Sequence, residues 1–346
     1  MRIGYSFWGF LGHGITDTPD GGRSHRRTLI DGLAERGHTP VFLQSDRDLT
    51  EAGEDFTETY TWHEGFPEID ALVLEWRWPI GGRNTTPCTA PNHTCDLHRQ
   101  TDLVDFYIHE QGLPTLVWDK DQHLPPNDPL RTHPAVTVCE AALYPAGGAH
   151  GLLFPVHDDA VQTADPEYLA LLRRDLPLVY AGNQYDRDQA FTRLFAPAAH
   201  RHRHLVAGKW PRTTGWPHVA FIGRRPFAEV QDLHRRSVTT MLLAPERYSR
   251  RGQFTQRLFE AVLAGCLPLG ASDMRGIDQI LPADLIVTDG HEAARRIDHL
   301  TAIAGTPRHA QLIAACLDGL EPFLLSRQLP VIESCLAAID HEGAHR

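Results

Sequence analysis

The sequence predicts an α/β protein made of two doubly wound domains, and three observations lead to this prediction. The chain has 346 residues, which is long enough for two domains of ordinary size. Hydrophobic residues make up 42% and charged residues 22% of the chain, the balance typical of a soluble globular protein. Short apolar segments alternate with helical segments along both halves, and glycine follows many of them, as in strand–turn–helix units.

The first half of the chain shows this alternation from its start. Apolar runs predict strands at residues 2–8 and 39–44, with a helix over about 23–36 that ends at Gly37. Another helix is expected over about 97–111. Further strands of this half are expected at residues 71–76, 114–118, 135–139 and 151–155.

The second half repeats the pattern after a linker with a short helix at residues 159–176. Helices over residues 291–345 are expected to close the chain. Strands are expected at residues 176–180, 204–207, 218–222, 239–244 and 285–288.

The sequence contains no sign of membrane insertion or export. No apolar run approaches membrane-spanning length, and the opening residues MRIGYSFWGF lack a basic region followed by a cleavable apolar segment. Four of the six cysteines, at positions 139, 266, 316 and 335, lie in apolar stretches and are expected to be reduced core residues. We therefore expect a cytoplasmic protein.

The net charge of −11 is unevenly distributed. Residues 1–160 hold 11 Lys and Arg against 24 Asp and Glu, and the remainder holds 22 against 20. Residues 200–257 alone hold 12 basic and 3 acidic residues, a local charge of +9. A basic segment in one half favours an anionic ligand such as a nucleoside diphosphate, and the acidic first half disfavours broad binding of nucleic acid there.

Residues 249–270 join a basic loop to an amphipathic helix. Apolar residues from Phe254 onward recur at helical spacing, and Gly265 ends the helix where a strand begins. Glu260 lies at the edge of the apolar stripe. A carboxylate there either forms an ion pair or has a functional role, because burying it without a partner costs several kcal/mol. From the spacing alone, a surface ion pair with Arg257 and a functional role remain equally open.

The sequence GQFTQRLFEAVLAGCLPLG in this stretch resembles the signature of GT-B glycosyltransferases of the nucleotide-sugar-dependent group 1/family 4-like clan. RLFEA at 257–261 and AG at 264–265 are similar to the spore-maturation-protein-like subgroup. The resemblance implies that Glu260 binds the donor ribose. The commoner family form has a second glutamate eight positions earlier, where this chain has Gly252.

The first strand–helix–strand unit is also similar to this clan, with a Gly-Gly pair before a helix that ends in LAERGH. The resemblance places Gly21 and Gly22 near the donor phosphates. These glycines do not form the spaced G-x-G-x-x-G of a dinucleotide site, which disfavours a dehydrogenase.

The resemblance implies the GT-B architecture, with two Rossmann-like domains facing across a cleft. It implies an acceptor-side domain at residues 1–160, a nucleotide-sugar-binding domain at 161–325, and a terminal helix at 326–346 that crosses back to the first domain.

The second domain supplies the other candidate donor-binding residues. The resemblance places Gly182 and Asn183, with Arg187 nearby, at the diphosphate. Cationic side chains at strand ends neutralise such a leaving group. The strand-end candidates are Lys209, Arg224 and Arg225, with Arg257 on the Glu260 helix.

Two clusters follow strands of the first domain, where open parallel sheets bind ligands. Glu75, Trp76 and Trp78 form a candidate acceptor wall, with core packing as the alternative for one of the tryptophans. Asp119, Asp121 and His123 are candidates for taking the proton from the acceptor hydroxyl. The alternative is a solvated loop in which Asp121 caps a turn.

Residues 87–100 contain two cysteines and two histidines, Cys88, His93, Cys95 and His98. Four such side chains within eleven residues suggest zinc, but their spacing matches no standard zinc finger. We therefore predict an ordinary loop and no metal, with a structural metal as the alternative.

The resemblance implies a hexosyltransferase-type enzyme. It would move a sugar from a nucleotide-diphosphate sugar to an acceptor hydroxyl, with retention of anomeric configuration and without a metal or other cofactor. A small-molecule acceptor is expected before nucleic acid. The alternatives are transfer to a modified base in DNA, a nucleotide-sugar epimerase, and a non-catalytic nucleotide-sugar binder on the same fold.

Overall fold

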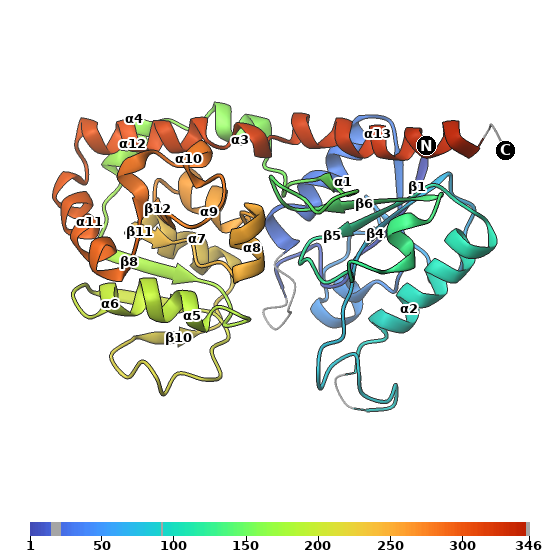
Figure 1. The fold of residues 1–346 in the computed structure, drawn as a ribbon, viewed down its shortest axis with the longest axis horizontal. Coiled ribbons are helices and arrows are strands. Elements are labelled where there is room, and N and C mark those ends of the chain that lie inside the picture. Colours follow the sequence, from blue (N-terminus) through green and yellow to red (C-terminus); the bar gives the residue numbers. More distant parts are fainter. Residues whose placement is uncertain (15–21, 91–92, 344–346) are drawn as a thin grey trace. The chain divides into compact units, whose positions relative to one another are not determined.

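The computed structural model describes residues 1–14, 22–90 and 93–343, and the chain divides into two compact units (Figure 1). Unit 1 comprises residues 1–153 and 325–346, and unit 2 comprises residues 154–324. Unit 2 is therefore continuous in sequence, whereas unit 1 is completed by the last helix, α13 (Leu325–Gly343).

Unit 1 is built on a seven-stranded sheet in the order β3-β2-β1-β4-β5-β6-β7, and its paired strands run parallel. The order of connection reverses beside β1, the point where open α/β sheets bind ligands outside the carboxyl ends of their strands. The central strands β4 and β5 are buried along their whole length, as parallel strands covered on both faces require. The strands are β1 (Arg2–Ser6), β2 (Thr39–Phe42), β3 (Thr61–Trp62), β4 (Ala71–Glu75), β5 (Thr115–Asp119), β6 (Val136–Glu140) and β7 (His150–Gly151).

Helices flank this sheet. The core on one side includes Leu72, Val117 and Leu103, the last of which comes from α2. Helix α13 packs against α1, β5 and β6. The helical segments are η1 (Gly22–Ser24), α1 (Arg26–Glu35), η2 (Asp48–Ala52), α2 (Asp96–Leu103), η3 (Val104–Glu110), η4 (Pro129–Thr132) and α13.

Unit 2 repeats the plan with a six-stranded sheet in the order β10-β9-β8-β11-β12-β13, again with parallel pairs. The reversal lies beside β8, so β8 holds the place in unit 2 that β1 holds in unit 1. The strands are β8 (Leu176–Ala181), β9 (His204–Ala207), β10 (Phe221–Gly223), β11 (Ser237–Met241), β12 (Leu267–Ala271) and β13 (Ile286–Val287).

The helical segments of unit 2 connect these strands and cover the sheet. They are α3 (Asp158–Gln162), α4 (Pro166–Leu171), α5 (Asp188–Ala190), η5 (Phe191–Phe195), α6 (Ala196–Ala199), α7 (Phe227–Arg236), α8 (Glu246–Arg251), α9 (Arg257–Leu263), α10 (Ile277–Ile280), η6 (Ala283–Leu285), α11 (Gly290–Ile303), α12 (Pro307–Asp318) and η7 (Glu321–Phe323). Among the described residues, no helix combines the length and the apolar character needed to span a membrane.

The stretch around Glu260 differs locally from the prediction. The helix was expected from Phe254, but α9 begins at Arg257. Phe254 is 2% exposed and packs edge-on against the ring of Phe323, with 6.1 Å between centroids. Its apolar character therefore reflects tertiary packing and not helix periodicity.

The predicted basic loop before it is also different, because residues 246–251 form the short helix α8. Gly252 ends this helix in the left-handed region, with φ 62° and ψ 46°. Glycine adopts this conformation without the steric cost that a side chain imposes. A backbone requirement thus explains why glycine stands where the clan commonly has an acid.

Two further predicted elements are shorter or less regular than expected. The helix expected over 97–111 is α-helical only to Leu103 and continues as the π-helical η3. The strand expected over 151–155 stops pairing after Gly151. The backbone N–H of Leu153 instead donates to Gln328 Oε1 on α13, at 2.7 Å.

Candidate active site

In unit 2, the turn after β8 brings together three of the predicted donor-binding residues. Lys209 N donates to Asn183 Oδ1 at 2.8 Å, and Gln184 N donates to the Lys209 carbonyl at 3.0 Å. Beneath the turn, the Trp210 indole donates to the Gly182 carbonyl at 2.7 Å. The turns after β8 and β9 therefore form one hydrogen-bonded surface made of Gly182, Asn183 and Lys209.

Arg257 covers this turn. Its Nε donates to the Ala181 carbonyl, and its guanidinium lies 5.6 Å from the centroid of the Tyr180 ring. A Cβ at Gly182 would come within 2.6 Å of Arg257 Nε, so only glycine leaves room for the guanidinium at this distance. A Cβ at Gly208 would overlap the Gly182 carbonyl oxygen. Close packing at this turn thus requires glycine at both positions.

A second buried arginine, Arg187, lies at the same turn and is 6% exposed. Its guanidinium donates to the carbonyls of Tyr185 at 2.8 Å and Leu243 at 3.2 Å. Burial lowers the pKa of Arg257, the Arg187 charge lowers it further, and Tyr180 and Glu260 oppose the shift. The Arg257 guanidinium nevertheless stays charged at neutral pH. The turn after β8 is therefore a cationic surface.

Glu260 lies one turn after Arg257 on α9 and is partly buried. The negative charge of Glu260 raises the pKa of Arg257 and so partly opposes the effect of burial. A small cavity of ≈ 20 Å³ borders Arg257, with Leu243, Phe254 and Met274 among its lining residues. The α9 start thus presents a cation, a carboxylate and a small hollow together.

Arg224 and Arg225 lie farther along the sheet. They follow the edge strand β10, which neighbours β9 and not β8. Arg225 is exposed and forms an ion pair with Glu229, with 3.9 Å between Nη1 and Oε2. The structure therefore places Lys209 at the Gly182 turn and these two arginines one strand away from it.

The basic segment at 200–257 is less cationic in the folded chain than its sequence charge suggests. At least seven of its basic residues form ion pairs, several with acids outside the segment. The pairs join Arg201 to Asp298, Arg203 and Arg236 to Asp175, Arg212 to Asp188, Arg225 to Glu229, Arg247 to Asp186, and Arg250 to Glu246. The guanidinium of Arg257 remains beside the Gly182 turn.

In unit 1, Glu75 ends β4 with its side chain fully buried. Arg26 binds its two carboxylate oxygens at 2.9 and 2.7 Å, Lys120 Nζ lies 2.5 Å from Oε2, and the Tyr5 hydroxyl donates to Oε1 at 2.9 Å. Burial alone raises the pKa of Glu75, but the charges of Arg26 and Lys120 outweigh it and hold the pKa well below the usual range. Internal partners therefore occupy this predicted acceptor contact.

Gly22 belongs to the same cluster. A Cβ at Gly22 would overlap the Arg26 guanidinium, so this glycine lies against the arginine that binds Glu75. The arrangement parallels Gly182 and Arg257 in unit 2. Gly21, the other predicted glycine, lies outside the described residues.

Asp119 ends β5, also with no exposed surface. It accepts the backbone N–H groups of His123 at 2.9 Å and Leu124 at 2.8 Å, and Arg131 Nη2 lies 3.8 Å from its Oδ2. Burial raises the pKa of Asp119 to about 6, although the two backbone N–H groups oppose the shift. Asp119 thus closes a tight turn, in which Gln122 has a φ of 56°.

The same turn carries the other two predicted catalytic residues. Asp121 and His123 are both partly exposed. The His123 ring stacks on Trp78 with 4.5 Å between centroids, and Trp78 meets Trp8 edge-on at 4.7 Å. Trp76 instead packs against the hydrophobic core, the alternative considered for one of the two tryptophans. The fold therefore brings Trp78 and His123 together and separates Trp76 from them.

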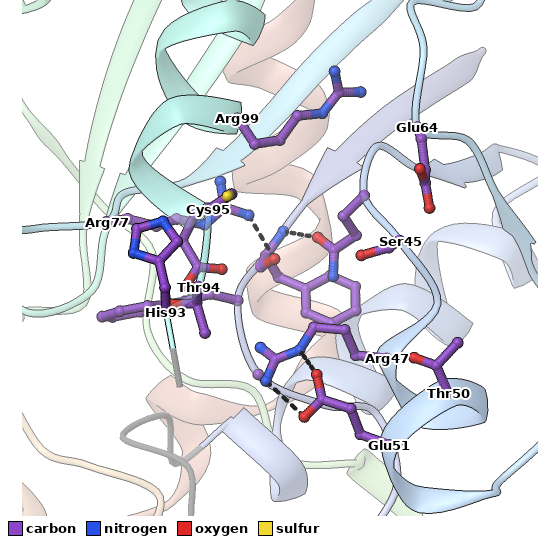
Figure 2. A pocket seen from close by; sticks show the side chains of 15 residues that line it. Ser45, Arg47, Thr50, Glu51, Glu64, Arg77, His93, Thr94, Cys95 and Arg99 are labelled. Carbon is purple, nitrogen blue, oxygen red and sulfur yellow. Dashed lines mark hydrogen bonds and ion pairs between the residues drawn. The ribbon is translucent and has the colours of Figure 1, made fainter. Parts of the chain in front are cut away.

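A cavity of ≈ 380 Å³ opens beside the ends of β1 and β2 in unit 1 (Figure 2). Arg47, Arg77 and Arg99 line it, together with residues 93–96. Arg77 is 2% exposed; its Nη2 donates to Ser6 Oγ at 2.8 Å, while its Nε and Nη1 have no hydrogen-bond partner among the described residues. This cavity was not predicted from the sequence. Its sequence signals were Arg77, which lies between the two candidate tryptophans, and the residues His93 and Cys95.

The titration of Asp119 predicts a pH dependence of stability. Its folded-state pKa of about 6 lies above the ordinary value of 3.8, so the folded chain holds this proton more tightly than the unfolded chain. The resulting stabilisation is fully present below about pH 4 and is lost as the pH rises through about 6. Relative to Asp119→Asn, wild type should therefore lose about 3 kcal/mol of unfolding free energy between these limits, because each unit of pKa difference corresponds to about 1.4 kcal/mol. Urea unfolding of both proteins measures this, and a difference that is independent of pH would contradict it.

Comparisons with known proteins show the fold. No protein-family model matches the sequence, and no curated protein matches it. T4 phage BGT in complex with UDP and Mn²⁺ matches with a TM-score of 0.63 at 12% identity, over 97% of this chain and 99% of that one. An α-glucosyltransferase in complex with UDP and a 13-mer DNA matches with a TM-score of 0.63 at 12% identity, over 96% of this chain and 100% of that one. AviGT4, a glycosyltransferase involved in avilamycin A biosynthesis, matches with a TM-score of 0.56 at 13% identity, over 98% of both chains.

These neighbours are GT-B glycosyltransferases, and the match extends over nearly the whole of each chain. The two units of this chain also share one strand order around β1 and β8, as two Rossmann-like domains do. The predicted fold is therefore confirmed: the chain has the α/β GT-B fold.

Proposed function

We propose that this protein is a glycosyltransferase that moves a sugar from a nucleotide-diphosphate sugar to an acceptor hydroxyl. The observation that carries the proposal is the cationic turn at the carboxyl end of β8, where Arg257 lies against Gly182 and Arg187 donates to the Tyr185 carbonyl. Open α/β sheets bind ligands at this position, and guanidinium groups match the geometry of a diphosphate. The UDP complexes of two structures with the same fold support this choice of donor.

In this proposal each donor-binding residue has a distinct role. Arg257 and Lys209 neutralise the diphosphate, the Gly182–Asn183 turn gives it room to approach the backbone, and Glu260 binds the ribose hydroxyls. Arg224 and Arg225 contribute at longer range from the end of β10, which β9 separates from β8. Gly22, and Gly21 outside the described residues, stay proposed contacts of the donor phosphates.

We further propose that guanidinium and ammonium groups balance the charge of the leaving diphosphate without a divalent cation. Three cationic side chains support this, because Arg187, Arg257 and Lys209 can donate to the diphosphate and cannot ligate a cation. The T4 enzyme was solved with Mn²⁺, so the proposal needs a direct measurement. Turnover that survives EDTA supports it, and turnover that requires added Mn²⁺ contradicts it.

We assign the acceptor to unit 1, at the turn that follows β5. The stacked rings of Trp78 and His123 offer an apolar platform for a sugar or an aromatic scaffold, with Asp121 beside it in the sequence. Asp119 has a pKa suited to a base but is enclosed and accepts two backbone N–H groups. We therefore favour retention of configuration, in which a phosphate oxygen of the leaving group assists the incoming hydroxyl. An NMR assignment of the product anomer decides between retention and an inverting mechanism with Asp121 or His123 as base.

A small-molecule acceptor is our preferred choice over DNA. The ion pairs within the basic segment reduce the cationic surface that a DNA backbone would need, and residues 1–160 carry a net charge of −13. The DNA complex of the structurally similar α-glucosyltransferase keeps a modified base in DNA as the second candidate. Binding of duplex DNA that weakens steeply with salt would favour the second candidate.

The donor site is tested first by a screen of nucleotide sugars for thermal stabilisation and for hydrolysis. A donor that stabilises the protein and is turned over with an acceptor supports glycosyl transfer. Donor binding without turnover would identify a non-catalytic binder, and nucleotide release without any acceptor, with the sugar recovered as its epimer, would indicate an epimerase.

The role of Glu260 is tested with the donor that the screen identifies. Glu260→Gln should weaken donor binding about 10-fold or more, because a carboxylate that accepts ribose hydroxyls contributes about 1.5–3 kcal/mol. Calorimetry of both proteins measures the change. Equal donor affinities would rule out the ribose role of Glu260 without affecting the proposed role of Arg257.

A further inference from the structure

The loop between β4 and α2 gathers four side chains that ligate metals. Cys88, His93, Cys95 and His98 each offer one ligand atom, and these four atoms lie within 4.8 Å of one another. Cys88 Sγ is 3.3 Å from His98 Nδ1. Cys95 precedes α2 and His98 lies in its first turn, three residues later, so the two side chains share one face. The irregular sequence spacing had favoured an ordinary loop, but the fold brings the four groups together.

His93 is oriented for a ligand by its neighbour Thr86. The Thr86 hydroxyl donates its one proton to the Arg83 carbonyl at 3.1 Å and lies 3.0 Å from His93 Nδ1. With that proton on the Arg83 carbonyl, the hydroxyl accepts from His93, and we assign the tautomer with the imidazole proton on Nδ1 and a lone pair on Nε2. His93 Nε2 is buried and has no hydrogen-bond partner among the described residues. A metal-bound histidine is held in this way, with its second nitrogen donating to an oxygen.

The loop has little apolar surface to hold it, since residues 81, 82, 85 and 87–89 are exposed. Hydrogen bonds order part of it, such as Ile80 N to Asn84 Oδ1 at 2.7 Å and Asn84 Nδ2 to the Trp78 carbonyl at 3.1 Å. A bound metal would add a cross-link between the two ends of residues 88–98. The loop nevertheless forms a wall of the large cavity of unit 1, to which His93 and Cys95 contribute (Figure 2).

We propose that Cys88, His93, Cys95 and His98 bind one Zn²⁺ ion in a structural site. Two thiolates and two imidazoles form a standard zinc ligand set, and the thiolates balance the charge of the ion. Zinc bonds of about 2.0–2.3 Å place tetrahedral ligand atoms about 3.3–3.8 Å apart. The four ligand atoms therefore need to move by only about 1 Å, through side-chain rotation, to reach the distances of a zinc site. All four positions are filled by protein, so the ion holds the loop and the cavity wall and activates no water.

Metal analysis of the full chain, purified without a polyhistidine tag and incubated with Zn²⁺ alone, tests the proposal. Wild type should hold about one zinc per chain after removal of free metal. Cys88→Ser and Cys95→Ser should each lose most of it, whereas His299→Gln, an exposed histidine on α11, should keep it. Wild type without zinc, or zinc content unchanged in the cysteine variants, would overturn the proposal. A Cys88–Cys95 disulfide in protein kept under reducing conditions would also overturn it.

Two further measurements protect the test against variants that fail to fold. Cobalt(II) added to wild type should give the absorption of a tetrahedral site with thiolate ligands, and an octahedral spectrum would contradict the ligand set. Thr86→Val should weaken zinc binding about 10- to 100-fold while leaving all four ligands in place. Equal zinc affinities in wild type and Thr86→Val would contradict the assignment of His93 Nε2 as the ligand atom.

Discussion

Replacing Arg257 by alanine is expected to weaken donor binding about 50-fold, the largest effect we predict for the donor site. The guanidinium lies over the Gly182 turn, held there by the Ala181 carbonyl, and in our proposal it faces the diphosphate. A charge-assisted hydrogen bond contributes about 1.5–3 kcal/mol when its partner loses it in a partly buried site. Calorimetry with the nucleotide sugar measures the change. Arg257→Lys should recover only part of the affinity, because an ammonium group lacks the planar fork of donors.

The matched control is Arg201→Ala. Arg201 belongs to the same basic segment but is exposed and pairs with Asp298 at 2.8 Å. Its removal should change donor affinity by less than about 2-fold, since an exposed ion pair contributes about 0–1 kcal/mol. If Arg257→Ala and Arg201→Ala bound the donor as wild type does, the β8 turn would not be the diphosphate site. Unfolding in the absence of donor shows whether each variant keeps its fold.

Glu75→Gln is expected to destabilise unit 1 by about 3–5 kcal/mol. The carboxylate compensates two cations that are themselves buried, Arg26 and Lys120. A neutral amide leaves both charges enclosed without an opposite charge, and an unpaired buried charge carries a large desolvation cost. Urea unfolding followed by far-UV circular dichroism measures the loss.

A control and a double variant make this prediction specific. Glu246→Gln removes an exposed ion pair with Arg250 and should cost less than about 1 kcal/mol. Lys120→Met combined with Glu75→Gln should recover part of the loss, because one of the two stranded charges disappears. If Glu75→Gln were as stable as Glu246→Gln, the Arg26–Glu75–Lys120 cluster would not act as a buried network. A folded variant with unchanged stability but a raised acceptor KM would instead restore Glu75 as an acceptor contact.

The fold could be predicted from the sequence because most of its strands can be recognised from residues that are close together in the chain. Parallel strands that are buried on both faces consist of runs of apolar residues. The observed bounds of β4, β5 and β9 accordingly lie within one residue of the predicted ranges. Local pattern failed where tertiary packing decides the conformation. Phe254 fits a helical stripe, but its contact with Phe323 keeps it outside α9.

The candidate site was predictable in part for the same reason. Cations and glycines that follow strands are visible in sequence, so Gly182, Lys209 and Arg257 were singled out, and the fold brings them together. Partners that are distant in sequence cannot be read in this way. The pairing of Arg203 with Asp175 and the enclosure of Glu75 by Arg26 are examples. Each of them changes the charge that a sequence count assigns to the surface.

The position of α13 has a consequence for how the chain folds during synthesis. Gln328 of α13 accepts the N–H of Leu153, and Leu325 and Leu329 pack against Gly32 of α1, so the last helix completes a unit whose sheet is made first. Unit 2 is continuous in sequence and is fully synthesised before α13 emerges. A chain interrupted near residue 324 would therefore contain all of unit 2 but expose the surface of unit 1 that α13 covers. The earliest strands to be made thus belong to the unit that is completed last.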